Sequence, residues 1–467
     1  MKRRAVLCAA LLAAALITAL ALWSAHGTRV KTLDGWALAG WRDVMRVDAS
    51  VEEDLRRVTG TQQLALLNRT GQDQTELALR LYPNAVTENS LVLRELTVDG
   101  QEAAFSQDAD DPSVLRVQVD WAAGEQLALS WRFTLVIPRE EGWFYRTNEE
   151  ALCVGALAVP ALWQDGAWRT DEWDVLAGPL GASKFDYLLT LDAPETVLAA
   201  FGGALIGREK AEDGRVIWTV QGDGALDMPF ALRLRGEGAL RQKDCGGVLV
   251  TALAESAAKA KRLLSQAEKA LSSLDKIGLP YEGRSLCIAQ AQTIFEDGLI
   301  GSGLIAVGEE ADEEQLLRRL TRLIARQRFG VAAQSDPWNA PWLSATLASA
   351  AELLAYRARV GEHAYETRFF GEVEVATRLT RPHGVTVGAS VDRFGGDEEM
   401  TQVLRDQGAA MLLGIEEAVG EEAFLRALAR YSELAGDDLA DQALLEAALL
   451  EATGSSWSGY LADELSW

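Results

Sequence analysis

The sequence predicts an α+β protein with a β-rich N-terminal half and a mainly α-helical C-terminal half. From about Met45 to Thr251, short apolar runs alternate with turns rich in Gly, Asp and Asn, which is typical of a β-sandwich-like domain. After Asp312, apolar residues recur at helical spacing almost to the end of the chain. With 467 residues, of which 48% are hydrophobic, the chain can bury a large core.

The β-rich half contains runs that alternate apolar and polar residues with the period of two of a half-buried strand. The clearest of these runs are residues 61–70, 76–83, 114–121, 125–138, 184–194 and 215–222. A helical segment that Gly278 is expected to end follows them, and then two more strand-like runs, 279–292 and 303–310. We place the boundary near Val250, with an N-terminal β domain over 45–250 and a second domain over 251–467.

The second domain is expected to hold helices at about 312–328, 342–360, 401–419, 421–435 and 439–452. The first of these begins with acidic residues, which the helix dipole favours. Its apolar stripe comprises Leu316, Leu317, Leu320, Leu323 and Ile324. Arg318, Arg322 and Arg326 follow one another at steps of four on another side. The pattern alone indicates a core helix with a solvated basic face.

The first 27 residues have the features of an export segment. Three positive charges at residues 2–4 precede an apolar run from Ala5 to Trp23, and small residues at 25 and 27 suit cleavage after Gly27. The apolar run has 19 residues, which is also long enough for an uncleaved membrane anchor. Residues 1–27 are therefore predicted to be a signal peptide or an anchor through residues 5–23. The protein is expected to be exported to the cell envelope or the exterior.

The formal charge of the chain is −24. This acidity argues against nucleic acid as a partner and against docking on anionic lipid. Three cysteines follow the export segment, Cys153, Cys245 and Cys287, and they form neither a CxxC pair nor a disulfide framework. We expect buried free thiols.

Four segments, taken in order, resemble the aminopeptidase N family of gluzincin metallopeptidases, especially its shorter secreted bacterial members. They are "LALLNRTGQDQTELALRLYPNAV" (64–86), the stretch 163–202 with "KFDYLLTLDAP", "IGLPYEGRSLCIAQA" (277–291) and "LRDQGAAMLLGIEEAVGEEAFLRALARYSELA" (404–435). The resemblance covers about residue 45 to the end. It implies a β domain followed by a thermolysin-like, mainly helical catalytic-type domain.

Members of that family bind zinc through the two histidines of HExxH and a glutamate nineteen residues further on, within PWLxE. The inner glutamate of HExxH activates water. In this chain "RLIARQRFG" occupies the position of the HExxH segment. Arg322 and Arg326 stand at the histidine positions, and Leu323 stands at the position of the glutamate that activates water. Ala345, in "PWLSA", stands at the third ligand position. The spacing is kept while every group that carries the chemistry is replaced.

Two other positions of the family pattern differ as well. The glutamate of the family's GGMExPGL loop, which binds the free amine of the substrate, corresponds to Ile300 in "DGLIGSGL". The tyrosine that would stabilise the oxyanion corresponds to Arg405, three residues before Gly408. The resemblance therefore implies a pseudopeptidase without catalytic residues, in which the zinc that the family uses is lost.

A non-catalytic binding or interaction protein is the interpretation we favour from the sequence. If Arg322, Arg326 and Arg405 line the former active-site cleft, they could bind an anionic ligand or a peptide there. Alternatively, the same arginines pair with local acids and fill the vacated site. Two other interpretations stay open: an active zinc aminopeptidase with relocated ligands, and a structural envelope or transporter-associated module. After Gly27 only His363 and His383 remain, with no partner at ligand spacing.

Overall fold

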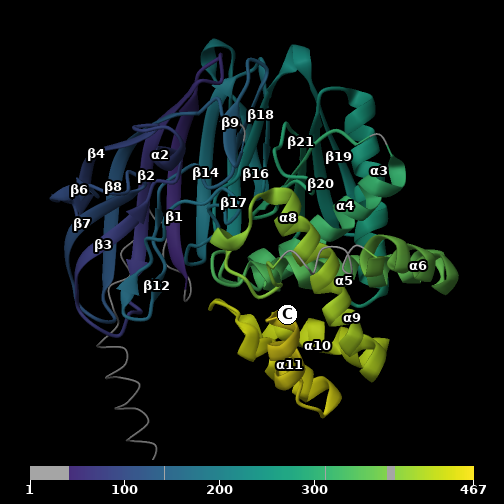
Figure 1. The fold of residues 1–467 in the computed structure, drawn as a ribbon. Coiled ribbons are helices and arrows are strands. Elements are labelled where there is room, and N and C mark those ends of the chain that lie inside the picture. Colours follow the sequence, from purple (N-terminus) through teal and green to yellow (C-terminus); the bar gives the residue numbers. More distant parts are fainter. Residues whose placement is uncertain (1–41, 141, 311, 376–383, 467) are drawn as a thin grey trace, which may run out of the picture.

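The structure is a computed structural model that describes residues 42–140, 142–310, 312–375 and 384–466. A β-rich N-terminal half lies beside a C-terminal half in which helices predominate, and the last helices of the chain lie at the bottom of the helical half in this view (Figure 1). The predicted α+β fold class is confirmed. The predicted signal or anchor, residues 1–27, lies outside the described residues.

An eight-stranded sheet forms the main layer of the N-terminal half, in the order β16-β17-β14-β1-β2-β8-β4-β5. Strands β1 and β14 pair in parallel, and the other neighbours are antiparallel. The bounds along the chain are β1 (Asp43–Val51), β2 (Arg57–Leu67), β4 (Leu91–Val98), β5 (Gln101–Glu102), β8 (Gln126–Val136), β14 (Phe185–Pro194), β16 (Ala204–Lys210) and β17 (Arg215–Ala225).

Two four-stranded sheets and a hairpin complete this half. Their orders are β15-β18-β10-β9, β11-β3-β7-β6 and β12-β13. The bounds are β3 (Gln74–Arg80), β6 (Phe105–Gln107), β7 (Val114–Trp121), β9 (Phe144–Arg146), β10 (Glu150–Cys153), β11 (Val159–Pro160), β12 (Trp163–Gln164), β13 (Ala167–Trp168), β15 (Val197–Phe201) and β18 (Phe230–Leu234), with the short helix α2 (Pro83–Val86) after β3.

Alternation of side chains explains why these sheets form. Along β14 every second residue from Phe185 to Ala193 is buried and the residues between them are partly exposed. Each of the six predicted runs contains a strand, namely β2, β3, β7, β8, β14 or β17. The apolar faces of the sheets meet in one core that continues into the helical half. Cys153, Cys245 and Cys287 are buried free thiols in this core, as predicted.

A five-stranded sheet begins the second half, in the order β19-β20-β21-β23-β22. Its strands are β19 (Ala239–Cys245), β20 (Val248–Ala254), β21 (Ser285–Gln290), β22 (Leu299–Gly301) and β23 (Leu304–Val307). The two strand-like runs expected after Gly278 are confirmed as β21 and β23. The proposed boundary near Val250 falls within β20. Strand β20 pairs with β19 on one side and with β21 on the other, so β19 and β20 belong to the sheet of the second half.

Helices cover this sheet and form the rest of the molecule (Figure 1). Helix α3 packs on β19 and β20, and α4 packs between α3 and α5. The bounds are α3 (Ala257–Lys276), α4 (Glu313–Arg326), α5 (Pro341–Val360), α6 (Glu362–Arg368), α8 (Asp397–Thr401), α9 (Gly408–Val419), α10 (Glu421–Ala435), α11 (Gln442–Thr453) and α12 (Ser458–Leu465). All five helices predicted after residue 311 are present, whereas α6 and α12 were not predicted.

Three π-helical turns interrupt the regular helices: η3 (Gln327–Ala332), η4 (Phe369–Glu374) and η7 (Gln402–Gln407). The segment predicted as one helix over 401–419 is therefore divided into the end of α8, η7 and α9. A π-turn inserts one extra residue per turn and shifts the side chains that follow around the axis. Two of the three turns, η4 and η7, carry residues that line the cleft described below.

Candidate functional site

Helix α4 carries Arg322 and Arg326, the two arginines that the sequence resemblance aligns with metal-binding histidines. Its N-terminus is capped by Asp312, whose Oδ1 accepts a hydrogen bond from the Gln315 N–H at 2.7 Å. The predicted apolar stripe is buried against the neighbouring helices. The pattern alone indicated that the basic side of this helix faces solvent, and this is wrong for two of its arginines. Arg322 is buried and Arg326 is partly buried. Both side chains face the cleft between α4 and α5.

Four of the sequence-predicted positions meet at one small cavity of about 60 Å³. Arg322, Arg326, Ala345 and Arg405 all line it, so α4, α5 and η7 contribute to the same site. Its apolar wall is made of Trp143, Leu176, Phe295, Met400 and Leu404. The positions expected to correspond to three zinc ligands and an oxyanion-stabilising group therefore converge in space.

Arg322 is bound by the carboxylate of Asp297. Its Nε donates to Oδ2 of Asp297 at 2.7 Å, and its Nη2 donates to Oδ1, which makes the pair bidentate. Only 8% of the Arg322 side chain and 17% of the Asp297 side chain is exposed. Burial alone would raise the pKa of Asp297, but the guanidinium groups of Arg322 and Arg405 hold that pKa below its ordinary value.

Arg405 is also paired, through three carboxylates. Its Nη1 donates to Glu296 at 2.8 Å, and its Nε and Nη2 donate to the two oxygens of Asp406 at 2.9 and 3.2 Å. Its Nη1 also lies 3.6 Å from Asp297. Because Asp297 contacts arginines from both α4 and η7, it links these two elements to the loop before β22.

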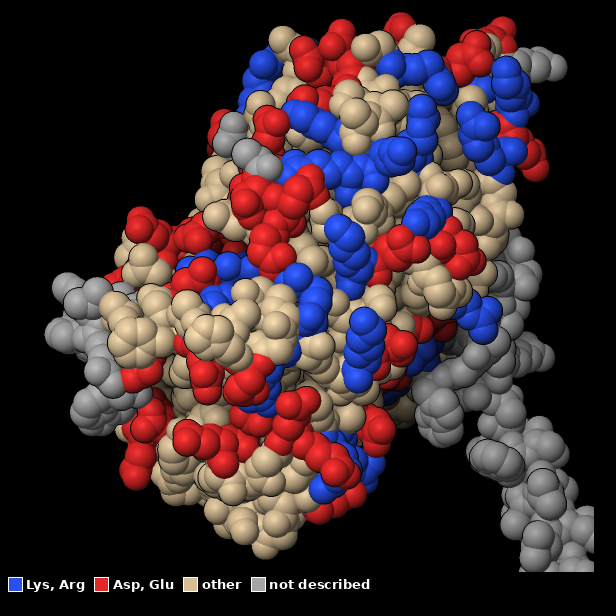
Figure 2. Space-filling view, turned by 90° about the vertical axis from the view of Figure 1, so that its right-hand side faces the viewer, with Lys and Arg blue, Asp and Glu red and all other residues tan. Residues whose placement is uncertain are grey.

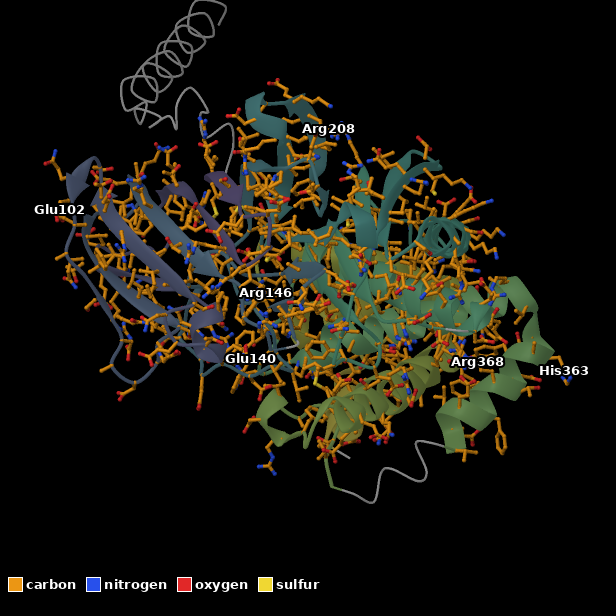
Figure 3. All side chains as sticks on the ribbon, turned by 90° about the horizontal axis from the view of Figure 1, so that it is seen from above. Glu102, Glu140, Arg146, Arg208, His363 and Arg368 are labelled. Carbon is orange, nitrogen blue, oxygen red and sulfur yellow. The ribbon has the colours of Figure 1, made fainter. Side chains whose placement is uncertain are left out.

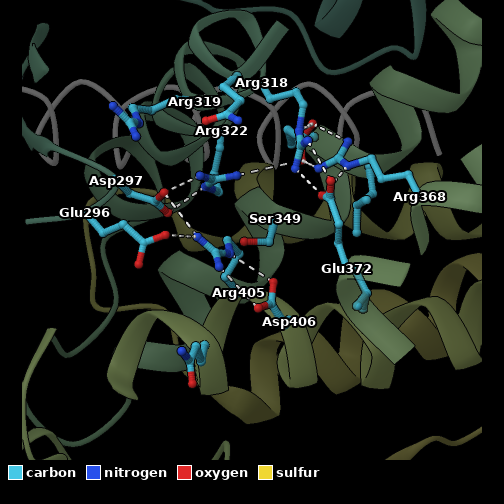
Figure 4. Close-up of a pocket in the computed structure, with 15 residues that line it drawn as sticks. Glu296, Asp297, Arg318, Arg319, Arg322, Ser349, Arg368, Glu372, Arg405 and Asp406 are labelled. Carbon is cyan, nitrogen blue, oxygen red and sulfur yellow. Dashed lines mark hydrogen bonds and ion pairs between the residues drawn. The ribbon is translucent and has the colours of Figure 1, made fainter. Parts of the chain in front are cut away.

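A larger cavity of about 520 Å³ adjoins this cluster (Figure 4). Five arginines line it: Arg318, Arg319, Arg322, Arg368 and Arg405. Five carboxylates line it as well: Glu296, Asp297, Glu352, Glu372 and Asp406. The charges of these lining side chains cancel (5 − 5 = 0), so this cavity is not cationic.

Glu352 of α5 is the most buried carboxylate of that cavity, with 3% of its side chain exposed. Both its oxygens accept hydrogen bonds from Arg368, at 2.9 and 2.8 Å, and one lies 3.8 Å from Nη1 of Arg322. Arg368 also donates to Glu372 at 3.0 Å. Figure 4 shows Arg318, Arg368 and Glu372 gathered on the side of Arg322 away from Asp297.

Arg326 differs from the other arginines of the cleft. Its Nε is fully buried and has no hydrogen-bond partner, and the guanidinium forms no ion pair with any residue between 42 and 466 that the structure describes. Burial lowers the pKa of Arg326, which the charges of Asp297 and Asp397 oppose. Three arginines and two aspartates, Asp297 and Asp397, line the small cavity. Because Arg405 is also paired with Glu296 and Asp406, which lie outside this lining, Arg326 is the arginine of the cavity that has no ion pair among the described residues.

The remaining two predicted positions, Leu323 and Ile300, lie elsewhere. Both side chains are fully buried in the hydrophobic core, and neither lines the two cavities. Leu323 belongs to the apolar stripe of α4, and Ile300 lies in the middle of β22. Leu323 and Ile300 are therefore packed residues of the hydrophobic core.

Sequence reasoning identified the arginines of the cleft but not the acids that neutralise them. One signal was available on α5, where Ala345, Ser349 and Glu352 are spaced i, i+4 and i+7 and therefore share a face. This spacing places Glu352 on the side of the expected third ligand position. For Asp297 no local pattern was sufficient, because its partners are 25 and 108 residues away in the chain (322 − 297 and 405 − 297).

Other candidate metal ligands lie away from the cleft or outside the described residues. His363 is exposed on α6 and projects at the outer edge of the molecule, further out than Arg368 (Figure 3). His383 lies outside the described residues. Within the described ranges, no group of three or more His, Cys, Asp or Glu side chains is arranged to hold a metal ion.

The surface of the helical half carries Lys and Arg side chains interspersed with Asp and Glu (Figure 2). Many of these charges are paired with each other, for example Lys259 with Glu309 and Arg430 with Glu451. In the part of the chain that the structure describes, every helix is too short or too polar to cross a membrane.

The β-rich half, the mixed sheet and the helical half together form the fold of the M1 zinc metallopeptidases. The solved structures with this fold include an M1 zinc metallopeptidase from Deinococcus radiodurans, with a TM-score of 0.64, 14% identity and coverage of 91% of this chain and 92% of that one. A glutamate-to-alanine mutant of the same enzyme, free and bound to a Tyr-Ser-Ala substrate, gives TM-scores of 0.65 at 14% identity, covering 91% of this chain and 93% of that one. The sequence matches no protein-family model and no curated protein.

Proposed function

We propose that this protein is a non-catalytic relative of the aminopeptidase N metallopeptidases and that its cleft binds a ligand without hydrolysing it. The observation that carries this proposal is the convergence of Arg322, Arg326 and Ala345 on one cavity of an M1-type fold. These are the positions at which the family resemblance expects the three zinc ligands.

The residues at these positions do not fit a zinc ion. Arginine stays protonated near neutral pH and offers no lone pair to a metal, and two guanidinium groups would repel the cation. The methyl group of Ala345 provides no donor atom. Leu323, at the position of the water-activating glutamate, is buried among apolar side chains and cannot accept a proton. We therefore derive no hydrolytic step.

The ion cluster around Asp297 gives the cleft a different means of cross-linking. A zinc ion bound by two helices holds those helices together. In this chain Asp297 contacts Arg322 of α4 and Arg405 of η7, while Glu352 of α5 contacts Arg368 of α6 and approaches Arg322. Carboxylate–guanidinium pairs thus join the elements that line the cleft.

Metal content tests the proposal most sharply when the site is also rebuilt. The variant with Arg322→His, Arg326→His and Ala345→Glu restores the three ligand types at their original spacing. A matched control carries Arg319→His, Arg326→His and Ala345→Glu. It has the same composition, but its two histidines are seven residues apart, about two helical turns, so they cannot share one zinc ion, and Arg319 does not line the small cavity. Each protein is loaded with zinc, dialysed and analysed for metal.

We expect no retained zinc in the wild type or the control and about one zinc per chain in the rebuilt variant. About one zinc per wild-type chain, together with chelator-sensitive hydrolysis of aminoacyl reporter substrates, would overturn the proposal. A rebuilt variant that retains no more zinc than the control would contradict the claim that these three positions keep the geometry of a ligand set.

Export is part of the same proposal. Lys2, Arg3 and Arg4 followed by the apolar run 5–23 support translocation, with the segment either cleaved after Gly27 or retained as an anchor. The N-terminal residue of the protein recovered from cells decides between these outcomes. A chain beginning at residue 28 indicates cleavage, and an intact N-terminus in the membrane fraction indicates an anchor.

A further inference from the structure

One arginine of the small cavity, Arg326, makes no ion pair with the described residues. Arg322 and Arg405, which also line this cavity, are both paired with carboxylates, so the unpaired guanidinium is that of Arg326. A buried donor without a partner, such as the Nε of Arg326, is unfavourable. The guanidinium of Arg326 therefore favours binding of a hydrogen-bond acceptor that carries a negative charge.

The size of the cavity restricts what that acceptor can be. A volume of about 60 Å³ has room for a few water molecules, and hence for a group of a few heavy atoms. A guanidinium presents parallel N–H donors at the spacing of the two oxygens of a carboxylate. Inorganic sulfate and phosphate monoesters carry close to two negative charges, and the second charge would meet the nearby carboxylate of Asp397, which also lines the cavity.

The rest of the cavity wall suits a carbon substituent on the acid. Trp143 and Phe295 form a tilted aromatic pair with ring centroids 5.4 Å apart, and Leu176, Met400 and Leu404 continue the apolar wall. Apolar walls with a few convergent polar groups are typical of sites that bind small molecules. The Arg326 side chain is partly exposed, so a ligand can reach it from solvent.

We infer that this cavity binds the carboxylate of a monoanionic ligand with a small apolar substituent, and that Arg326 is its principal contact. The inference deepens the proposed function and rests on it, because a zinc ion at the same position would exclude the ligand. A short-chain monocarboxylic acid and the C-terminal carboxylate of a peptide share this chemistry.

The experiment is calorimetric titration of purified, chelator-treated protein with two probes at constant ionic strength. Sodium propionate represents the free acid. N-acetyl-alanyl-alanine, compared with its C-terminal amide, represents a peptide terminus. The variants are Arg326→Met, which removes the charge, Arg326→Lys, which keeps the charge but not the paired donors, and Arg319→Met as the control. Arg319 lies on the same helix, pairs with Glu310 and does not line the small cavity.

We expect saturable binding of at least one acid to the wild type, at least tenfold weaker binding to Arg326→Met, an intermediate loss for Arg326→Lys, and unchanged binding to Arg319→Met. The peptide acid binding while propionate and the amide do not would identify the peptide terminus as the source. Absence of saturable binding to the wild type would overturn the inference. So would equal binding by wild type and either Arg326 variant, or an equal loss in Arg319→Met.

Metal analysis of wild-type protein from the same purification, loaded with zinc and dialysed without chelator, separates this inference from the proposed function. About one retained zinc per chain, together with chelator-sensitive hydrolysis of aminoacyl reporter substrates, would refute the proposed function. A zinc-free wild type that binds neither acid would refute only the assignment of the cavity.

Discussion

Arg322 and Arg326 lie one turn apart on the same face of α4, yet their surroundings differ. Arg322 makes a bidentate pair with Asp297 and lies 3.8 Å from Glu352. Arg326 lines the same small cavity and makes no ion pair with the described part of the chain. The first arginine is part of a neutral cluster of five arginines and five carboxylates, and the second is the arginine of the small cavity that has no ion pair among the described residues.

The comparison indicates that two arginines one turn apart on one helix can differ in what they contribute. A buried guanidinium that meets a carboxylate can replace a metal as a cross-link, although its net contribution is limited by desolvation. A guanidinium that meets none retains its capacity to bind an anion. The difference depends on which acids the neighbouring elements supply, rather than on α4 itself.

We call Asp297 with Arg322 and Arg405 the paired half of the cleft, and Arg326 the unpaired half. The largest effect should come from removing the carboxylate of Asp297. Asp297→Ala leaves Arg322 without its bidentate partner and takes one carboxylate from Arg405, so we expect the free energy of unfolding to fall by about 3 kcal/mol. Urea denaturation of the two proteins measures this change.

The control for that experiment is Glu422→Gln, which removes an exposed carboxylate paired with Arg426 and should change the free energy of unfolding by less than about 0.5 kcal/mol. If Asp297→Ala is no more destabilising than this control, the paired half does not hold the cleft together.

A smaller effect is expected from Glu352→Gln. The substitution keeps the shape of the side chain but removes its charge, and Arg368 retains its hydrogen bond to Glu372. We therefore expect a loss of about 2 kcal/mol in the free energy of unfolding. Glu421→Gln is the control, since Arg357 keeps Glu416 after that change. Equal effects of the two substitutions would show that burial of Glu352 has no energetic role.

The smallest of the expected effects is on the pH dependence of stability, in which Asp297 and Asp397 should act in opposite directions. The pKa of Asp297 is lowered in the folded protein, although burial opposes this, because Arg322 and Arg405 stabilise the carboxylate. Its contribution is therefore present above pH 4 and is lost as the pH falls through the folded pKa. The pKa of Asp397, near Arg326, is raised above 3.8, chiefly by burial. Its ionisation therefore destabilises the protein at neutral pH, and acidification relieves this cost.

Two variants separate these opposite contributions. Asp297→Asn should reduce the acid-induced loss of stability, while Asp397→Asn should remove a gain and so steepen the net acid-induced loss relative to wild type. Urea midpoints between pH 3 and pH 7 measure both. Changes of the same sign in the two variants would contradict the assigned pKa directions.

Much of the fold was predictable because its signals are local. Alternation over 114–121 and 184–194 identified β7 and β14, and the apolar stripe of α4 identified its buried side. The π-turn at 402–407 was not predictable, because it depends on tertiary packing around Arg405 and Asp406 rather than on periodicity. Helix α12 was missed for a different reason, because its eight residues are too few to show a clear helical period.

The site was predictable in position but not in electrostatics. Spacing and flanking residues brought Arg322, Arg326 and Ala345 to one place, and the structure has all three at one cavity. The charge of the cleft depends on acids such as Asp297, which comes from a loop that sequence periodicity does not orient. Only their positions in space distinguish a paired arginine from an unpaired one.

The most direct test of this account compares Arg322→Met with Arg326→Met by urea denaturation at pH 7 in buffer without carboxylic acids. Arg322→Met removes the bidentate partner of Asp297 and leaves that carboxylate only Arg405, 3.6 Å away, so we predict a loss of about 2–3 kcal/mol in the free energy of unfolding. Arg326→Met removes a buried donor that has no partner, so we predict no loss and a gain of up to about 1 kcal/mol. A loss for Arg326→Met as large as that for Arg322→Met would contradict the division of the cleft into a paired and an unpaired half.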